Sequence, residues 1–189
     1  FKILKLGVTK KFLNGPINKS KFLDKKFPGI TEYISKSFKR KKTAMLIYNN
    51  KLSVCPVTTH LPLKTVAKKV SVTLIKEKTF LINIFYLKNF NYRPKIAITG
   101  LNPHCESIFK YNEDDKILKP TIKSLQKLNM KVSGPFPADT IFLKKSREKY
   151  DVIIGMYHDQ VLSPFKTLFE YNAINITLGL PFLRVSPDH

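Results

Sequence analysis

Apolar residues recur along this chain in two different rhythms, and each rhythm predicts one kind of secondary structure. Short apolar runs rich in Val, Ile and Leu predict buried strands, and they occur at 43–48, 52–57, 95–100, 151–156 and 173–177. A further strand is expected around 131–133. Apolar residues three and four positions apart predict amphipathic helices, at 31–42, 63–69, 72–90, 114–129, 140–147 and 159–169, after the end of another helix within 1–9. Thr31 is the predicted N-cap of the helix at 31–42, because its hydroxyl can accept a hydrogen bond from the first turn.

The order of these elements predicts the fold class. Asn49-Asn50 between the first two strands suits a tight turn, so residues 43–57 predict an antiparallel hairpin. The remaining strands alternate with helices, which is typical of a largely parallel sheet that is covered on both faces. We therefore expect an α/β protein, a three-layer α/β/α sandwich around a mixed sheet. The longest apolar stretch, residues 80–87, is too short to cross a bilayer, so we expect no membrane association.

The amino-acid composition limits which kinds of molecule the protein is expected to bind. Hydrophobic residues make up 43% of the chain, which is enough to form a core, and the formal net charge is +21. The lysines are spread over the whole length, with the densest run at residues 39–42, and no zinc-finger or RNA-recognition motif accompanies them. We therefore expect a solvated lysine face that attracts phosphorylated small molecules, and no nucleic-acid partner. Two cysteines are too few for a disulfide framework, which favours a reducing cytoplasm.

Three of the four histidines follow the ends of predicted strands. They are His60, His104 and His158. Ligands of open α/β sheets bind at the carboxyl ends of the strands, and imidazole is the commonest protein ligand for zinc and related ions. These histidines are too far apart for a zinc-finger clip, so their placement indicates a divalent metal site assembled by folding. The alternative is that each is a hydrogen-bonded loop residue.

Six segments of the chain carry a family resemblance. They are residues 15–19, 58–63, 100–104, 134–140, 156–160 and 175–184. In this order and near this spacing, they resemble the 4-hydroxythreonine-4-phosphate dehydrogenase family of pyridoxal phosphate biosynthesis. The resemblance implies a cytoplasmic enzyme with an isocitrate/isopropylmalate-dehydrogenase-like fold, which is a homodimer with its active site at the subunit interface. Residues 1–189 would then be a partial catalytic region of a two-lobed dehydrogenase, without its N-terminal and C-terminal portions.

The resemblance also implies cofactors and a reaction. The cofactors are NAD or NADP and a divalent metal such as Zn, Mg or Co. No Gly-x-Gly-x-x-Gly follows a predicted strand, so the dinucleotide is not expected to be held in the Rossmann manner. The reaction is the oxidation and decarboxylation of 4-phosphooxy-L-threonine to 3-amino-2-oxopropyl phosphate, in which the metal acts as a Lewis acid. The phosphorylated substrate needs cations for its phosphate and carboxylate.

Site residues follow from the resemblance by position. The metal ligands would be His60, His104 and His158, of which one can come from the partner subunit. Asp139, Asp159 and Lys166 match catalytic positions, and the residues that match substrate-binding positions are Thr31, Lys166, Asn175 and Arg184. For Lys166 and Arg184 the alternative is a solvated surface charge.

Two departures from the family pattern leave other functions open. Ile30 occupies the position of a family histidine in the substrate pocket, and it cannot form a hydrogen bond. Residues 105–112 replace a glycine-rich loop with bulky residues, which restricts close approach of the backbone to a ligand. One alternative function is a paralogous dehydrogenase of another phosphorylated hydroxy acid, such as 4-phosphothreonate. The other is a catalytically dead relative that retains the metal.

Overall fold

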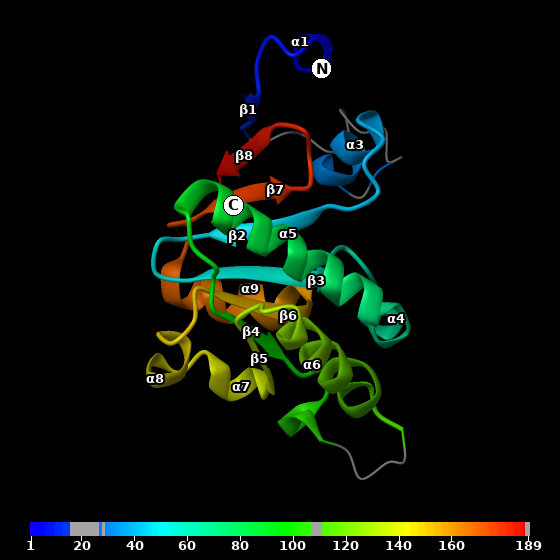
Figure 1. Ribbon diagram of the computed structural model, residues 1–189, viewed down its shortest axis with the longest axis vertical. Coiled ribbons are helices and arrows are strands. Elements are labelled where there is room, and N and C mark those ends of the chain that lie inside the picture. The colour runs from blue at the N-terminus through cyan, green and yellow to red at the C-terminus, as the bar shows by residue number, and fades with distance from the viewer. Residues whose placement is uncertain (16–26, 28, 107–110, 188–189) are drawn as a thin grey trace.

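The computed structural model describes residues 1–15, 27, 29–106 and 111–187, which form one mixed sheet with helices on both faces (Figure 1). Within these residues the strand order is β1-β8-β7-β2-β3-β6-β4-β5. The strands are β1 (Lys11–Leu13), β2 (Ala44–Tyr48), β3 (Ser53–Thr58), β4 (Ile96–Thr99), β5 (Val132–Phe136), β6 (Val152–Tyr157), β7 (Ile174–Leu178) and β8 (Leu183–Pro187). The predicted α/β fold class with a mixed sheet is confirmed.

Strand directions decide where a site can form. Strands β3, β6, β4 and β5 are mutually parallel neighbours, so their carboxyl ends meet at one edge of the sheet. Strand β2 is antiparallel to both β3 and β7, which confirms the predicted hairpin. Strand β8 is antiparallel to β7 and parallel to β1.

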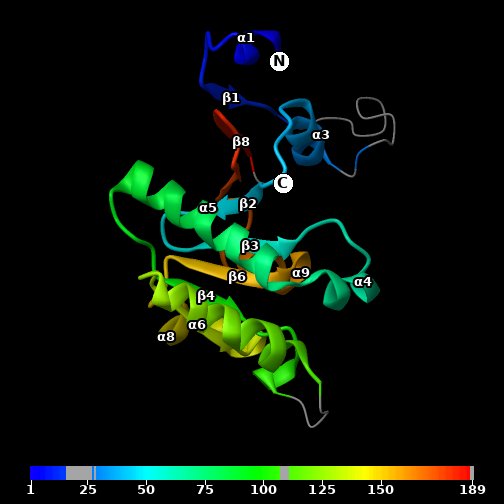
Figure 2. The same ribbon diagram turned by 45° about the vertical axis from the view of Figure 1, so that its right-hand side comes forward.

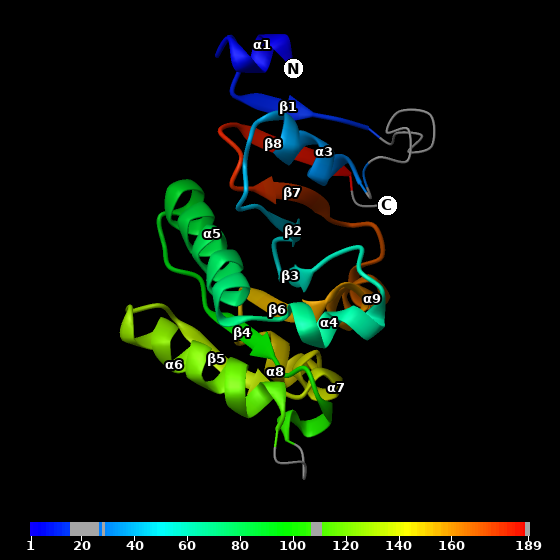
Figure 3. The same ribbon diagram turned by 90° about the vertical axis from the view of Figure 1, so that its right-hand side faces the viewer.

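Helices cover both faces of the sheet, as predicted. Helices α4 (Leu63–Lys69), α5 (Val72–Phe90) and α6 (Lys119–Lys127) pack on one face, and α7 (Ala138–Ile141) and α9 (His158–Phe169) pack on the other. Figure 3 shows α5 and α6 on the opposite side of the strands from α9. The shorter elements are α1 (Lys2–Lys5), α3 (Ile30–Ser37), α8 (Lys144–Arg147), the single turn η1 (Pro103–Cys105) and the π-helical turn η2 (Asp114–Leu118).

Alternation along the central strands divides the core into two layers. In β6, Ile154 faces the layer under α5 and α6, while its neighbour Ile153 faces the layer under α9. Both side chains are fully buried. Because successive strand residues point to opposite faces, a strand covered on both sides must be apolar throughout. The continuous apolar runs in the sequence follow from this requirement.

The structure corrects several predicted boundaries. Helix α3 begins at Ile30 with Gly29 as its N-cap, so the prediction of Thr31 as N-cap is wrong. The helix predicted at 140–147 is divided between the short helices α7 and α8. Strands β1 and β8 were not predicted. Four of the five residues in the segment 15–19 lie outside the described residues. In the described part of the chain, no helix is long and apolar enough to span a membrane.

The N-terminal residues extend the sheet at one end. Figure 2 shows β1 and α1 beyond β8, at the opposite end of the sheet from α6. Aromatic side chains connect these elements: the ring of Phe12 lies 6.3 Å from that of Phe182, and the ring of Phe38 lies 4.8 Å from that of Phe182. This packing places α3 beside the end of the sheet. From there α3 extends to the edge of the sheet where the candidate histidines lie.

Candidate active site

Three neighbouring strands place the candidate histidines after their carboxyl ends. His60 follows β3, His158 opens α9 directly after β6, and His104 lies in η1 after β4. Strand β6 lies between β3 and β4. All three histidines therefore follow strands that end at the same edge of the sheet.

His60 and His158 form a pair. Their ring centroids are 6.2 Å apart and their planes are inclined by 35°. Each ring has a carboxylate at Nδ1: Glu32 Oε1 lies 3.3 Å from Nδ1 of His60, and Asp159 Oδ1 lies 2.7 Å from Nδ1 of His158. A neutral imidazole that donates from Nδ1 keeps its Nε2 lone pair for a metal ion. The donor set therefore fits a divalent metal.

His104 lies apart from this pair. Its turn, η1, packs beside β5, on the far side of β4 from β6. His104 is exposed and has a positive φ of 56°, a conformation that costs free energy for a residue other than glycine. Among the described residues, no three His, Cys, Asp or Glu side chains are grouped closely enough to hold a metal ion. A site with three histidines therefore stays a prediction, with one ligand expected from the partner subunit.

A buried carboxylate anchors the loop that carries His104. Asp114 is fully buried and accepts hydrogen bonds from the backbone N–H groups of Leu101 and Asn102, at 2.8 and 3.0 Å. It also accepts one from the Asn102 side-chain amide at 2.8 Å. A Cβ at Gly100 would lie 2.8 Å from Asp114 and 2.6 Å from the Cys105 sulfur, so only glycine fits there. The sequence analysis missed Asp114 because its partners are a dozen residues away.

A buried glutamine ties together the strand ends beneath His104 and His158. Gln160 Oε1 accepts hydrogen bonds from the Thr99 hydroxyl at 2.8 Å and from the Met156 N–H at 2.7 Å. Its Nε2 donates to the Gly100 carbonyl at 2.7 Å. Since Thr99 ends β4 and Met156 lies near the end of β6, one side chain sets the spacing of both strand ends. Gln160 lies within the matching segment 156–160, but the sequence analysis did not select it.

Arg184 lies in the interior beside this edge. It is 1% exposed, so the alternative of a solvated surface charge is wrong for this residue. Its Nε donates to Asn14 at 2.8 Å, and its guanidinium also donates to the Thr177 hydroxyl at 3.1 Å. Burial lowers the pKa of Arg184, while the negative charge of Glu32 acts in the opposite direction. Arg184 and Glu32 therefore influence each other electrostatically.

The other predicted residues are more dispersed. Lys166 lies on α9 eight residues after His158, about 12 Å along the helix axis, and its ammonium group lies 4.8 Å from the Tyr171 ring centroid. Asn175 lies on β7, and its Oδ1 is buried without a hydrogen-bond partner among the described residues. Asp139 is exposed on α7. Their catalytic and substrate-binding roles stay predictions.

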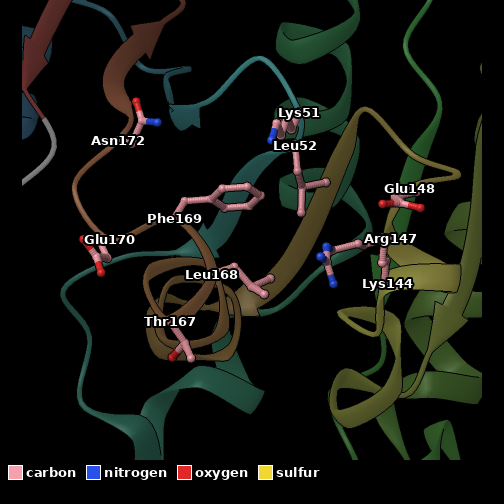
Figure 4. Close-up of a pocket in the computed structure, with 10 residues that line it drawn as sticks. All are labelled: Lys51, Leu52, Lys144, Arg147, Glu148, Thr167, Leu168, Phe169, Glu170 and Asn172. Carbon is pink, nitrogen blue, oxygen red and sulfur yellow. The ribbon is translucent and has the colours of Figure 1, made fainter.

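The cavities of the structure differ in whether the candidate histidines line them. A small cavity of about 80 Å³ lies at the histidine edge, where Thr31, Glu32, His60 and Lys78 contribute to its lining. A larger cleft of about 660 Å³ lies at the opposite edge and is lined by residues such as Lys51, which precedes β3 (Figure 4). None of the predicted site residues lines it. Because ligands of α/β sheets bind at the carboxyl ends of strands, we place the candidate site at the histidine edge, between the small cavity at His60 and a cavity of about 170 Å³ that His158 and Asp159 help to line.

Neither cysteine is available as a thiolate. Burial raises the pKa of the Cys55 thiol to about 12, and burial together with the charge of Asp114 raises that of Cys105 to about 11. At pH 8, about one Cys105 side chain in a thousand is therefore ionised. We expect neither thiol of the folded protein to react with iodoacetamide at pH 8, and both to react in denaturant. Mass spectrometry of the two peptides tests this, and rapid alkylation of either thiol before unfolding would contradict it.

Comparison with known proteins connects this site to a family. The family model of the pyridoxal phosphate biosynthetic protein PdxA matches residues 2–189. The 4-hydroxythreonine-4-phosphate dehydrogenase of Aquifex aeolicus is 40% identical over 180 residues, which cover 94% of this chain and 56% of that protein. The D-threonate 4-phosphate dehydrogenase of Salmonella typhimurium is 38% identical over 165 residues, which cover 86% of this chain and 50% of that protein.

A solved structure supports the same relation. The crystal structure of a 4-hydroxythreonine-4-phosphate dehydrogenase from Klebsiella pneumoniae matches with a TM-score of 0.83 and 33% identity, covering 100% of this chain and 58% of that one. The predicted isocitrate/isopropylmalate-dehydrogenase-like α/β/α fold is confirmed. The chain spans about half the length of the curated relatives that it matches.

Proposed function

Because the chain belongs to the pyridoxal phosphate biosynthetic protein PdxA family, we propose that the full-length protein is a metal- and NAD-dependent 4-hydroxythreonine-4-phosphate dehydrogenase. The secondary hydroxyl of 4-phosphooxy-L-threonine would lose its proton, and the carbon that bears it would transfer its hydrogen as a hydride to NAD and become a ketone. The resulting β-keto acid would lose carbon dioxide and give 3-amino-2-oxopropyl phosphate. The observation that carries this proposal is the pair His60 and His158, each with a carboxylate at Nδ1.

The residues at the histidine edge have distinct roles in this proposal. His60 and His158 would hold a divalent metal, which supplies Lewis-acid polarisation of the substrate oxygen. Asp159 lies at His158 and is exposed, so its carboxylate is accessible to a substrate at this edge. Thr31 lines the adjoining cavity and offers a hydroxyl to the substrate. Arg184, beside Glu32, gives this edge a buried positive charge that favours an anionic substrate.

We propose that a homodimer completes the site. The exposed turn that carries His104 points to a role across an interface, because His104 lies apart from the other two histidines in its own chain. A second subunit could therefore supply its copy of His104 to the pair formed by His60 and His158. Lys166 and Asn175 would bind substrate in the assembled enzyme.

An activity measurement with defined metals tests this function. We expect the full-length protein to form NADH from 4-phosphooxy-L-threonine, to lose this activity after removal of metals by a chelator, and to regain it with Zn, Co or Mg. The three metals should restore different rates, since imidazole ligands bind them with different affinities. Undiminished NADH formation by the metal-free protein would contradict a metal-dependent dehydrogenase. Failure of every metal to support turnover would favour the catalytically dead relative.

The residue at position 30 is expected to determine which of two candidate substrates the enzyme prefers. The position is half-buried at the start of α3, next to Thr31 in the substrate region. We expect Ile30→His in the full-length protein to raise kcat/KM for 4-phosphooxy-L-threonine about tenfold, the order of one additional hydrogen bond to a charged substrate. The reference measurement uses D-threonate 4-phosphate, the substrate named for the Salmonella typhimurium relative. If the variant loses activity on the better of the two substrates, Ile30 is a specificity adaptation and the paralogous dehydrogenase is the better assignment.

A further inference from the structure

Glu32 reaches across from α3 to a metal-ligand candidate on another element. It lies in the first turn of α3, whereas His60 follows β3. Glu32 Oε1 is 3.3 Å from His60 Nδ1, and the same oxygen accepts a hydrogen bond from the Thr59 hydroxyl at 3.5 Å. Residues 59 and 60 are thus both held by one carboxylate that is 27 or more positions away in the sequence.

Gly29 makes this contact possible by leaving space. A Cβ at Gly29 would lie 2.7 Å from Glu32 Oε2 and 3.2 Å from His60 Cε1. The backbone at Gly29 is extended, with φ −163° and ψ 171°, which any residue can adopt. A side chain at position 29 would therefore displace the Glu32 carboxylate, while the backbone conformation itself does not call for glycine.

The two oxygens of Glu32 differ in their contacts. Oε1 contacts both His60 Nδ1 and the Thr59 hydroxyl. The other oxygen, Oε2, is buried and has no hydrogen-bond partner among the described residues. A buried oxygen without a partner costs free energy. The contact with His60 and Thr59 is therefore accompanied by a local cost in stability at Oε2.

We propose that Glu32 is the positioning residue of His60, which fixes the imidazole as the Nδ1–H tautomer and directs the Nε2 lone pair into the metal site. This inference rests on the proposed metal-dependent function. Outer carboxylates of this kind orient ligand histidines and raise their basicity. Asp159 holds the His158 ring less firmly in one orientation, because Asp159 is the next residue in the sequence and its side chain is 78% exposed. Water competes more readily for the place of Asp159 than for that of Glu32, whose side chain is 32% exposed.

The first test measures tautomers in the metal-free, full-length protein. Nitrogen-15 chemical shifts of histidine side chains distinguish the Nδ1–H from the Nε2–H form, with His60 assigned by its loss in His60→Ala. We expect His60 to be mainly the Nδ1–H tautomer in the unmodified protein, and a mixture in Glu32→Ala. Glu32→Gln keeps an acceptor oxygen, so it should largely retain the tautomer. Glu148→Gln, at an exposed glutamate on the opposite edge, is the matched control and should leave His60 unchanged.

The second test measures metal affinity by competition with a chromophoric chelator. We expect Glu32→Ala to bind Zn²⁺ and Co²⁺ about 10- to 100-fold more weakly, with Glu32→Gln between Glu32→Ala and the unmodified protein. Gly29→Ala should weaken binding in the same direction, because the added Cβ displaces the Glu32 carboxylate. Thermal unfolding of each metal-free variant shows whether it remains folded. The partial recovery in Glu32→Gln distinguishes positioning from a general structural role.

The outcomes separate this inference from the proposed function. If Glu32→Ala folds and leaves both the His60 tautomer and the metal affinity unchanged, the positioning role is overturned. A lowered melting temperature with unchanged affinity would equally overturn it. If His60→Ala binds metal as tightly as the unmodified protein, the proposed metal site fails, while the tautomer measurement still decides whether Glu32 controls His60.

Discussion

Alanine at either His60 or His158 is expected to lower turnover of the full-length protein by about 1,000-fold, which corresponds to the loss of about 4 kcal/mol of transition-state stabilisation by the metal. The two imidazoles face each other at 6.2 Å between centroids. Removal of either leaves too few nitrogen ligands to hold the ion at the substrate oxygen. The loss should therefore be similar for the two variants and should appear in kcat. Steady-state NADH formation at saturating metal measures it.

Chemical rescue provides the control for this experiment. Free imidazole should partly restore turnover to both alanine variants, because it can occupy the vacated space and supply the missing nitrogen. Metal affinity, measured separately, should fall in parallel with turnover. If one variant retains the turnover of the unmodified protein, that histidine is a hydrogen-bonded loop residue, which is the alternative that the sequence leaves open.

Most strands could be predicted because the parallel part of the sheet is buried on both faces. Residues 152–156 of the predicted strand are continuously apolar for this reason, and β6 occupies Val152–Tyr157. Strand β8 was missed because it contains Arg184, which a pattern of hydrophobicity assigns to the surface. The structure buries this guanidinium by pairing it with Asn14 and Thr177, two residues that only folding brings to it. Strand β1 is three residues long and carries too short a pattern to recognise.

The start of α3 shows why local rules failed at the site. Thr31 has the side chain of a good N-cap, but Gly29 takes that position. Glycine is also a favoured N-cap residue, so the local preference alone does not decide between the two positions. What the sequence does not reveal is the close approach of Glu32 and His60, for which Gly29 leaves space.

The candidate site was predictable only in part, and the division has a physical cause. Histidines that follow strands are visible in the sequence, because strand ends can be read from apolar patterns. Their supporting residues are not visible, because hydrogen-bond partners such as Glu32, Asp114 and Gln160 act across loops and elements. Each of these partners is a polar residue at the start of a helix or in a turn, where polar residues are common, so the sequence does not single it out.

Gln160 illustrates how much such a hidden residue is expected to contribute. Its side chain is buried and satisfies three buried groups: the Thr99 hydroxyl, the Met156 N–H and the Gly100 carbonyl. Gln160→Leu keeps the volume and removes every hydrogen bond. Each buried group left unpaired costs about 1–3 kcal/mol, so we expect the free energy of unfolding to fall by about 4 kcal/mol. Denaturant titration of the full-length protein measures this change.

Gln126 is the matched control for this loss. It is exposed and makes one hydrogen bond, from its amide to the Val132 carbonyl at 2.9 Å. Because Gln126 is exposed and only one acceptor would lose its partner, Gln126→Leu should change the free energy of unfolding by about 1 kcal/mol, well below the loss expected for Gln160→Leu. An equal cost for the two leucine variants would show that the buried network around Gln160 contributes little.

Gln160→Glu tests the same network without a change in shape, and its effect should depend on pH. A glutamate can still accept from Thr99 and Met156, but as a carboxylate it cannot donate to the Gly100 carbonyl and instead faces it with a negative oxygen. Burial and this repulsion raise the pKa of the new carboxyl in the folded state above its ordinary value of about 4.3. Relative to the unmodified protein at each pH, the variant should therefore be least destabilised near pH 4, where the carboxyl is protonated and can donate. Destabilisation should grow as the pH rises through the folded-state pKa, because the unfolded chain ionises more readily. A penalty that is constant between pH 4 and 8 would mean that the Gly100 carbonyl does not depend on this donor, and that the strand ends beneath His104 and His158 are held by packing instead.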